Sequence, residues 1–413
     1  MTQPGEAVAV AATVESSPGA VGGAVLRRPR LALAMLAVGQ VVSWGVLYYA
    51  LIVAAPVIAA DTGWGVDAVV GLFSLGLVVA ALAGIAVGRA IDDRGPRAIM
   101  AGGSALGAAG LAVVAVAPTP VWFAVGWVVV GVAQAAVLYQ AVFTVLTRRY
   151  GPRRRGALTV ITLAGGLAST IFAPTVAVML PGFGWRATFL ALAVLLAVTT
   201  VPIHLTVLER RWPVHEPHDE LAALHPSPGV RAVLRLWRFW RLTAATALTG
   251  VAMYAATLSL VPLLMERGIP FELAAVGLGL LGAGQVAGRL LYLALPHRAA
   301  PWVPFVVVGA AATVLLGALG LIPGPAWLLI AVAVLVGAVR GAQTLVQASA
   351  VADRWGTADY GVLNGVSSAP VTIVLALSPA IGALVASGLG SYALMTLVMA
   401  GVAGVAAILS RAT

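Results

Sequence analysis

The sequence contains no cysteine and no lysine, and only 9% of its 413 residues are charged. Without cysteine the chain can form no disulfide and has no thiol chemistry. Without lysine it has no phosphate-binding loop of the G-x-x-x-x-G-K-[ST] type and no Schiff base with retinal or pyridoxal. A soluble protein normally carries about 25% charged residues, so this chain is too poor in charge to cover a soluble surface.

Hydrophobic residues make up 61% of the chain, and they fall into long runs. A run of roughly 20 such residues is the length that crosses about 30 Å of hydrocarbon. No segment alternates polar and apolar residues over about 10 positions, as a membrane β-barrel would. The pattern predicts an all-α membrane protein whose twelve spans lie at about 31–58, 67–87, 98–117, 120–146, 156–180, 185–207, 240–265, 271–295, 303–322, 326–350, 360–386 and 390–410.

The spans divide the chain into four parts. We expect an N-terminal cytoplasmic tail over 1–30, a six-helix bundle over 31–207, a polar cytoplasmic linker over 208–239, and a second six-helix bundle over 240–413. The tail does not resemble a signal peptide, because its basic residues follow the apolar stretch. The end of the linker, Val230 to Arg241, has the pattern of an interfacial amphipathic helix that leads into the next span.

The two halves repeat with an offset of 205 residues. Gly45 and Tyr49 in the first half match Gly250 and Tyr254 in the second. A longer matching set is Arg149, Tyr150, Gly151, Gly156, Leu158 and Pro174 against Arg354, Trp355, Gly356, Gly361, Leu363 and Pro379. Parallel repeats of six helices are typical of secondary transporters, which bind substrate near the midplane between the halves.

All 24 basic residues are arginine, and their distribution predicts the orientation. If the N-terminus is inside, twenty arginines lie in cytoplasmic segments and only Arg186 and Arg267 in outer loops. This bias predicts cytoplasmic N- and C-termini and a multi-pass protein of the cytoplasmic (inner) membrane. It also explains the basic net charge without a nucleic-acid partner.

The turn after the second predicted span resembles the cytoplasmic signature of the major facilitator superfamily. Gly88, Asp92, Gly95 and Arg97 fit that signature, while Asp93 stands where its first arginine is expected. The resemblance extends over all twelve spans. It implies two pseudo-symmetric bundles, alternating access, and a cavity lined by spans 1, 4, 7 and 10.

Within the superfamily, the chain is most similar to the branch of monocarboxylate transporters and oxalate/formate antiporters. The similar stretches are SWGVLYYALIVAAPVIAADTGW (43–64), RRYGPRRRGALTVITLAGGLAS (148–169) and Gly184-Trp185-Arg186. The resemblance implies that Arg289 engages a substrate carboxylate. Proton-coupled members carry Asp where this chain has Gln285, and oxalate/formate antiporters carry a lysine in span 11 that this chain lacks.

Two arginines, Arg289 and Arg340, lie inside predicted spans. Counted from the cytoplasmic ends of their helices, they are about 12 Å and about 20 Å deep. All fourteen acidic residues lie in tails, loops or span ends. Because a buried arginine without a partner is costly, we expect an anionic ligand to supply the missing charge. The alternative is that water and helix carbonyls satisfy both groups structurally.

Polar residues on the cavity-lining spans are further candidates for substrate contact. With Arg289 and Arg340, the predicted binding residues are Tyr49, Tyr139, Gln140, Tyr254, Gln285 and Asn364. The alternative for each is a hydrogen bond between helices, worth about 0.6 kcal/mol on average.

The polar turns at the cytoplasmic ends predict a conformational latch between the halves. Its candidate residues are Gly88, Asp92, Gly95, Arg97, Asp353 and Arg354. Asp92 could cap a helix N-terminus or pair with an arginine, and release that contact as the halves rock. Plain positive-inside topology is the competing explanation for the arginines.

These patterns favour a secondary or facilitative transporter of a small organic anion, a mono- or dicarboxylate. An efflux pump for hydrophobic drugs or a natural product is the alternative. We expect no enzyme activity, cofactor or metal: the spans lack catalytic clusters, and the spacing of His215, His218, His225 and Asp219 matches no metal template. The expected partners are the substrate and the bilayer, and the expected state is a monomer.

Overall fold

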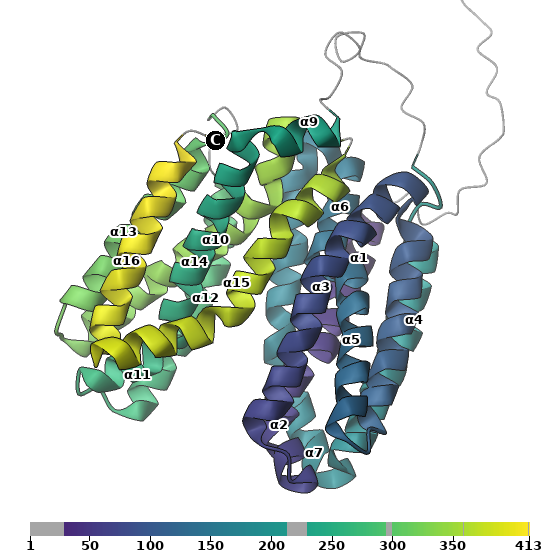
Figure 1. Ribbon diagram of the computed structural model, residues 1–413, viewed down its shortest axis with the longest axis horizontal. Helices are drawn as coiled ribbons and strands as arrows, with labels where there is room; N and C mark the ends of the chain where they lie inside the picture. The colour runs from purple at the N-terminus through teal and green to yellow at the C-terminus, as the bar shows by residue number, and fades with distance from the viewer. Residues whose placement is uncertain (1–28, 213–228, 295–299, 358, 412) are drawn as a thin grey trace, which may run out of the picture.

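The computed structural model describes residues 29–212, 229–294, 300–357, 359–411 and 413. Every regular element in these ranges is helical. The helices form two bundles that stand side by side (Figure 1). The predicted all-α architecture is confirmed.

The first bundle contains the elements from α1 to α7. They are α1 (Pro29–Trp44), the π-helical turn η1 (Gly45–Tyr49), α2 (Ala50–Thr62), α3 (Val66–Arg94), α4 (Pro96–Ala115), α5 (Pro120–Val137), α6 (Tyr139–Tyr150), the short 3₁₀ helix η2 (Gly151–Arg153) and α7 (Arg154–Val207).

The second bundle contains the elements from α10 to α16, and the short helix α9 (Val230–Arg235) precedes it. They are α10 (Trp237–Leu258), α11 (Leu260–Glu266), α12 (Phe271–Ala294), α13 (Val303–Leu321), α14 (Ala326–Trp355), α15 (Tyr360–Leu389) and α16 (Tyr392–Ser410).

Ten helical runs among the described residues are long and apolar enough to cross a membrane, and the bent pair α10–α11 makes an eleventh. One of the ten, α7, has 54 residues, about 81 Å at 1.5 Å per residue. It turns at Gly184, whose φ of 69° lies in the left-handed region open to glycine. Because α7 supplies two spans, the part of the chain that the structure describes holds the twelve predicted.

Local sequence explains several helix ends. The Thr119 side chain accepts a hydrogen bond from the Trp122 backbone N–H, and Pro120 occupies the first turn of α5. Ser391 caps α16 in the same way. Gly63 ends α2 in the left-handed conformation, the usual role of glycine at a helix C-terminus.

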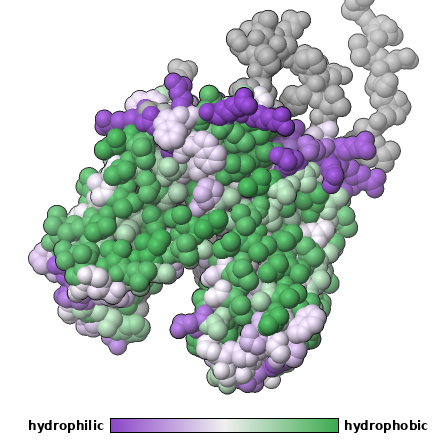
Figure 2. Space-filling model, in the orientation of Figure 1, coloured by the Kyte–Doolittle hydropathy of each residue, from purple (hydrophilic) through white to green (hydrophobic). Residues whose placement is uncertain are grey.

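The apolar core shows how the two bundles meet. One buried cluster joins residues of both, from Leu36 and Ile91 to Leu345 and Tyr360. The other two clusters belong to the first and the second bundle separately. The shared cluster lies at the end of the molecule that holds the turns near residues 95, 151 and 356, called here the arginine-rich end. At the opposite end, the open end, the bundles are parted and a deep notch separates them (Figure 2).

The linker differs in part from the sequence prediction. An amphipathic helix was expected over 230–241, but α9 ends at Arg235 because Leu236 is extended, with φ −74° and ψ 125°. Arg238 and Arg241 therefore belong to the first turns of α10. Residues 1–28 and 213–228, which include most of the predicted tail and the three histidines of the linker, lie outside the described residues.

Candidate functional site

Helices α12 and α14 pack against each other almost backbone to backbone. Gly284 and Gly288 of α12 face the α14 backbone, and Gly337 and Gly341 of α14 face the α12 backbone. A methyl group at any of the four would collide with the opposite main chain. Small residues four apart permit this close approach between membrane helices. Since Arg289 follows Gly288 and Arg340 precedes Gly341, the contact brings both arginines to one region.

Arg289 extends from the second bundle to the first. Its side chain is buried, with the residue 8% exposed. A methyl group added at Gly166 of α7 would lie 2.5 Å from Arg289 Nη1. The guanidinium group interacts electrostatically with the phenol groups of Tyr49, Tyr139 and Tyr254. Its Nε is buried without a hydrogen-bond partner, so the hydrogen-bonding capacity of this cation is not fully used.

Arg340 lies against a tyrosine of the same bundle. Its Cζ is 3.8 Å from the centre of the Tyr254 ring, a cation–π contact. It also interacts electrostatically with Tyr48 and Tyr49 of the first bundle. Both arginines therefore interact electrostatically with Tyr49 and Tyr254. We call Arg289, Arg340, Tyr49, Tyr139 and Tyr254 the central site.

An aromatic wall from the first bundle faces the two cations. Trp44 lies 4.8 Å from Tyr139 and 5.4 Å from Tyr48 between ring centres. The wall is shaped by η1, where the helix widens into a π-helical turn, a feature frequent at functional sites. Gly45 opens this turn against the ring of Phe172, and a side chain there would overlap that ring.

The central site has cations but no carboxylate among the described residues. The ion pairs within the described part of the chain are Arg148–Asp92, Arg154–Asp353 and Arg186–Asp61. Neither Arg289 nor Arg340 takes part in one of them. The site thus combines two guanidinium groups with phenol and indole rings, a chemistry suited to a flat or carboxylated anion.

Three other predicted binding residues occupy different surroundings. The Gln140 side chain lies between Gly84 of α3 and Gly365 of α15, and its Nε2 is buried without a partner. Asn364, next to Gly365 on α15, accepts a hydrogen bond from Ser368 Oγ at 3.4 Å. The structure therefore places Gln140 between the bundles, while the contact of Asn364 lies within its own helix. Gln285 lies one turn before Arg289, where its carbonyl meets Gly341.

The first contact between the bundles at the arginine-rich end is the crossing of α3 with α15, called here the glycine crossing. A methyl group at Gly361 would lie 2.5 Å from the carbonyl oxygen of Gly88 and 2.7 Å from Asp92 Oδ2. The Val362 N–H donates to Asp92 Oδ2 at 2.9 Å, and Arg148 Nη1 lies 3.1 Å from Asp92 Oδ1. Asp92 thus makes both contacts considered from sequence, a helix cap and an arginine pair.

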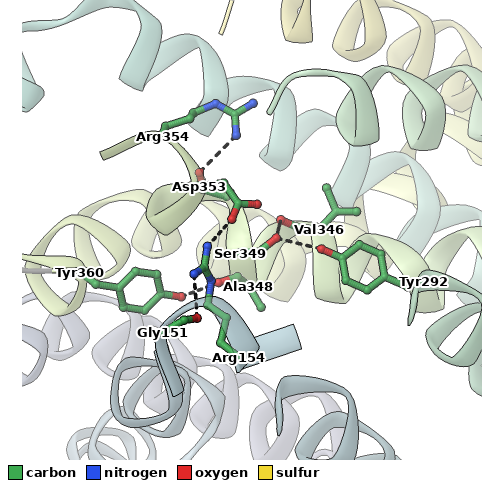
Figure 3. A network of polar contacts seen from close by, with 10 residues as sticks. Gly151, Arg154, Tyr292, Val346, Ala348, Ser349, Asp353, Arg354 and Tyr360 are labelled. Atoms are coloured by element: carbon green, nitrogen blue, oxygen red, sulfur yellow. Dashed lines mark hydrogen bonds and ion pairs between the residues drawn. The ribbon is translucent and has the colours of Figure 1, made fainter. Parts of the chain in front are cut away.

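The second contact joins α7 to α14 and α12, and we call it the arginine contact (Figure 3). Arg154 Nη2 donates to Asp353 Oδ1, and Arg154 Nη1 donates to the Gly151 carbonyl at 2.9 Å. Arg155 Cζ lies 5.5 Å from the centre of the Tyr292 ring. The Tyr292 hydroxyl is in turn 3.0 Å from Ser349 Oγ.

The remaining predicted latch residues contact their own half of the chain. Arg97 Nε donates to the Leu208 carbonyl at 2.6 Å, and Gly95 packs against the backbone of Arg210. Arg354 donates to the Pro301 carbonyl at 2.9 Å and to Thr413 Oγ1 at 3.0 Å. These three residues fix the turns and the linker, while Gly88, Asp92 and Asp353 lie between the bundles.

Several residues that build the site were missed from sequence. The glycine pairs had a readable signal, since Gly284 and Gly288, and Gly337 and Gly341, have the G-x-x-x-G spacing. Gly166 and Phe172 carried no such signal, because their partners are distant in the chain.

Comparison with known proteins identifies the fold. The family model described as Major Facilitator Superfamily matches residues 33–326. The structure is similar to FucP, a Major Facilitator Superfamily transporter crystallised in the outward conformation, with a TM-score of 0.70, 16% identity, and 92% of this chain and 97% of that chain covered. It is also similar to the human organic anion transporter MFSD10 (TETRAN), with a TM-score of 0.69, 16% identity, and 93% and 99% covered.

One curated relative matches a part of the sequence. It is an uncharacterized 38 kDa protein in the 23S RNA operon of Thermoproteus tenax, 31% identical over 153 residues. The match covers 37% of this chain, and the chain spans 40% of the relative's length.

Proposed function

Because the chain belongs to the Major Facilitator Superfamily, we propose that it is a secondary or facilitative transporter that moves a small organic anion, a mono- or dicarboxylate, by alternating access. The cytoplasmic membrane is the proposed location, with both termini on the cytoplasmic side. The arginine bias of the predicted loops supports this orientation.

The observation that supports an anionic substrate is the pair of arginines without a carboxylate partner. Arg289 and Arg340 interact electrostatically with the same two tyrosines, and neither forms an ion pair with the described residues. A cation at the centre of a membrane helix costs at least about 2.5 kcal/mol. A carboxylate would offset this cost, because guanidinium donates two parallel hydrogen bonds to it. The resemblance of Arg289 to the carboxylate-binding arginine of monocarboxylate transporters supports the same role.

The transport cycle would use the two contacts at the arginine-rich end. In this structure the bundles share a core at that end and are parted at the other. If the arginine-rich end is cytoplasmic, the conformation is outward-open, and a substrate reaches Arg289 and Arg340 through the notch. Inward opening would then break the glycine crossing and the arginine contact, which act as the latch.

The proposed coupling rests on the lack of an acidic partner for the central arginines among the described residues. No carboxylate of the described residues pairs with Arg289 or Arg340, so we propose no dedicated carboxylate proton relay. The cycle is anion exchange, facilitated diffusion, or movement with a proton carried by the substrate or another group.

Uptake by proteoliposomes tests the anion site. We expect Arg289→Gln to abolish carboxylate uptake and Arg340→Gln to reduce it. Arg186→Gln is the matched control, because it removes an arginine from an exposed pair with Asp61. If Arg289→Gln transports carboxylates as well as the parent, the proposed function is refuted.

The aromatic wall favours a second candidate, an efflux pump for hydrophobic drugs or a natural product. Trp44, Tyr48 and Tyr139 offer a largely apolar surface, and a cationic drug is disfavoured by the two arginines. Competition in a binding assay separates the candidates. Displacement of a bound probe by lactate or oxalate supports the anion transporter, and displacement by lipophilic compounds alone supports the pump.

A further inference from the structure

A cavity separate from the central site lies at the arginine-rich end of the second bundle. Its volume is about 530 Å³, within the range of about 300–1,000 Å³ that is usual for small-molecule sites. The lining residues are Trp237, Arg238, Arg241, Trp302, Arg411 and Thr413. They come from the start of α10, the residue before α13 and the end of α16, three helix ends at one level (Figure 1).

The cavity is strongly positive. Among the described residues, six line the cavity, of which three are arginines and none is acidic. Arg238, Arg241 and Arg411 are absent from the ion pairs formed by the described residues. The N-terminus of the 22-residue helix α10 also lies at the cavity and adds the positive end of its dipole. The cavity is therefore built to hold an anion.

The cavity also lies where a polar surface meets an apolar one. Trp237 is 73% exposed and Trp302 is 38% exposed, and exposed tryptophans at helix ends mark the headgroup level of a membrane. Below it, the outer face of α16 exposes Val405 and Ile408. Figure 2 shows hydrophilic residues gathered along this end, directly above hydrophobic surface.

The frame of the cavity is held by Arg354. This side chain donates to the Pro301 carbonyl at 2.9 Å and to Thr413 Oγ1 at 3.0 Å. It thereby ties the end of α14 to the segment before α13 and to the residues after α16. Arg354 therefore holds two of the three helix ends around the cavity at fixed positions relative to α14.

We propose that this cavity binds the phosphate headgroup of an anionic phospholipid. The three arginines would hold the phosphodiester, the two tryptophans would lie beside the glycerol region, and the acyl chains would follow the apolar face of α16. Basic pockets between membrane helices at the cytoplasmic side bind such headgroups. Free phosphate shares the charge but would make no use of the adjacent apolar face.

Native mass spectrometry of the purified full-length protein tests this site. The protein is titrated with phosphatidylglycerol and, separately, with phosphatidylcholine, and the bound lipids are counted. We expect one phosphatidylglycerol to be retained in preference to phosphatidylcholine. Each arginine near an anionic headgroup contributes about fivefold in affinity, so R238Q/R241Q/R411Q should bind about a hundredfold more weakly.

Two matched variants separate the site from general charge and from misfolding. R153Q/R210Q/R211Q removes three exposed arginines elsewhere on the same end and should keep the bound lipid. R238K/R241K/R411K keeps the charge and should retain most of the affinity. The proposal is overturned if R238Q/R241Q/R411Q binds phosphatidylglycerol as tightly as the parent does. It is also overturned if R153Q/R210Q/R211Q loses as much lipid affinity, or if inorganic phosphate displaces the lipid.

Discussion

The two contacts that close the arginine-rich end differ in kind, although the sequence repeat makes them counterparts. The glycine crossing brings the backbones of α3 and α15 together, and a buried Asp92 carboxylate accepts the Val362 N–H across it. The arginine contact instead uses long side chains of α7 that reach α14 and α12, and its ion pair is partly exposed, at 14% for Arg154 and 24% for Asp353.

The difference shows which contact sets the closed position. Backbones in contact tolerate no added atom, because protein interiors are close-packed. Long side chains can follow a moving partner and are screened by water. We therefore expect the glycine crossing to determine whether this end closes, and the arginine contact to adjust how firmly it stays closed. The repeat offers a direct control, since Gly361 corresponds to Gly156, where an added methyl group would meet nothing.

The largest effect should come from a side chain in the glycine crossing. Gly361→Val places methyl groups where the Gly88 carbonyl and the Asp92 carboxylate lie, which should cost the closed state about 3 kcal/mol or more. Spin labels on single cysteines at Arg94 and Pro301, in a chain without native cysteine, would report a longer distance across this end. Gly156→Val should leave that distance unchanged. Equal distances in the two variants would remove the distinction between the contacts.

A smaller effect should follow from loss of the Asp92 carboxylate. Asp92→Ala leaves the Val362 N–H and Arg148 without their charged partner, and a hydrogen bond to a charged group contributes about 1.5–3 kcal/mol. The same labels should show a mixed population in which the open form of this end has increased. Asp93→Ala, which removes the exposed neighbouring carboxylate, is the control and should show the parent distribution.

The smallest effect should come from the arginine contact. In a double-mutant cycle with Arg154→Gln and Asp353→Asn, the coupling energy should be about 1 kcal/mol, because the pair is partly exposed. The equilibrium between label distances measures it. The same cycle on Arg186 and Asp61, an exposed pair at the open end, should give no coupling at the arginine-rich end. A coupling larger than the effect of Asp92→Ala would reverse the proposed order of the contacts.

The fold was largely predictable, and the central site was predictable in part. Run length, arginine bias and the repeat are local or periodic signals, and the twelve spans read from them agree with the structure once α7 is divided at Gly184. Arg289 and Arg340 were visible as charges inside apolar runs. Gln140 and Asn364 were equally visible as polar residues, yet Gln140 packs between Gly84 and Gly365 and Asn364 accepts a hydrogen bond from Ser368 of its own helix. A polar residue in a span does not reveal whether it faces a cavity or another helix.

The sequence by itself determined the membrane class, the two six-helix halves and the presence of two deep cations without a deep acid. Each of these depends on composition or on spacing along one helix. Only the tertiary structure decided that Arg289 and Arg340 share the same tyrosines, that Asp92 caps α15, and that three arginines from α10 and the end of α16 surround one cavity. All of these contacts depend on how closely helices distant in the chain approach, and for α12 with α14 and α3 with α15 that distance is set by glycines on both helices at once.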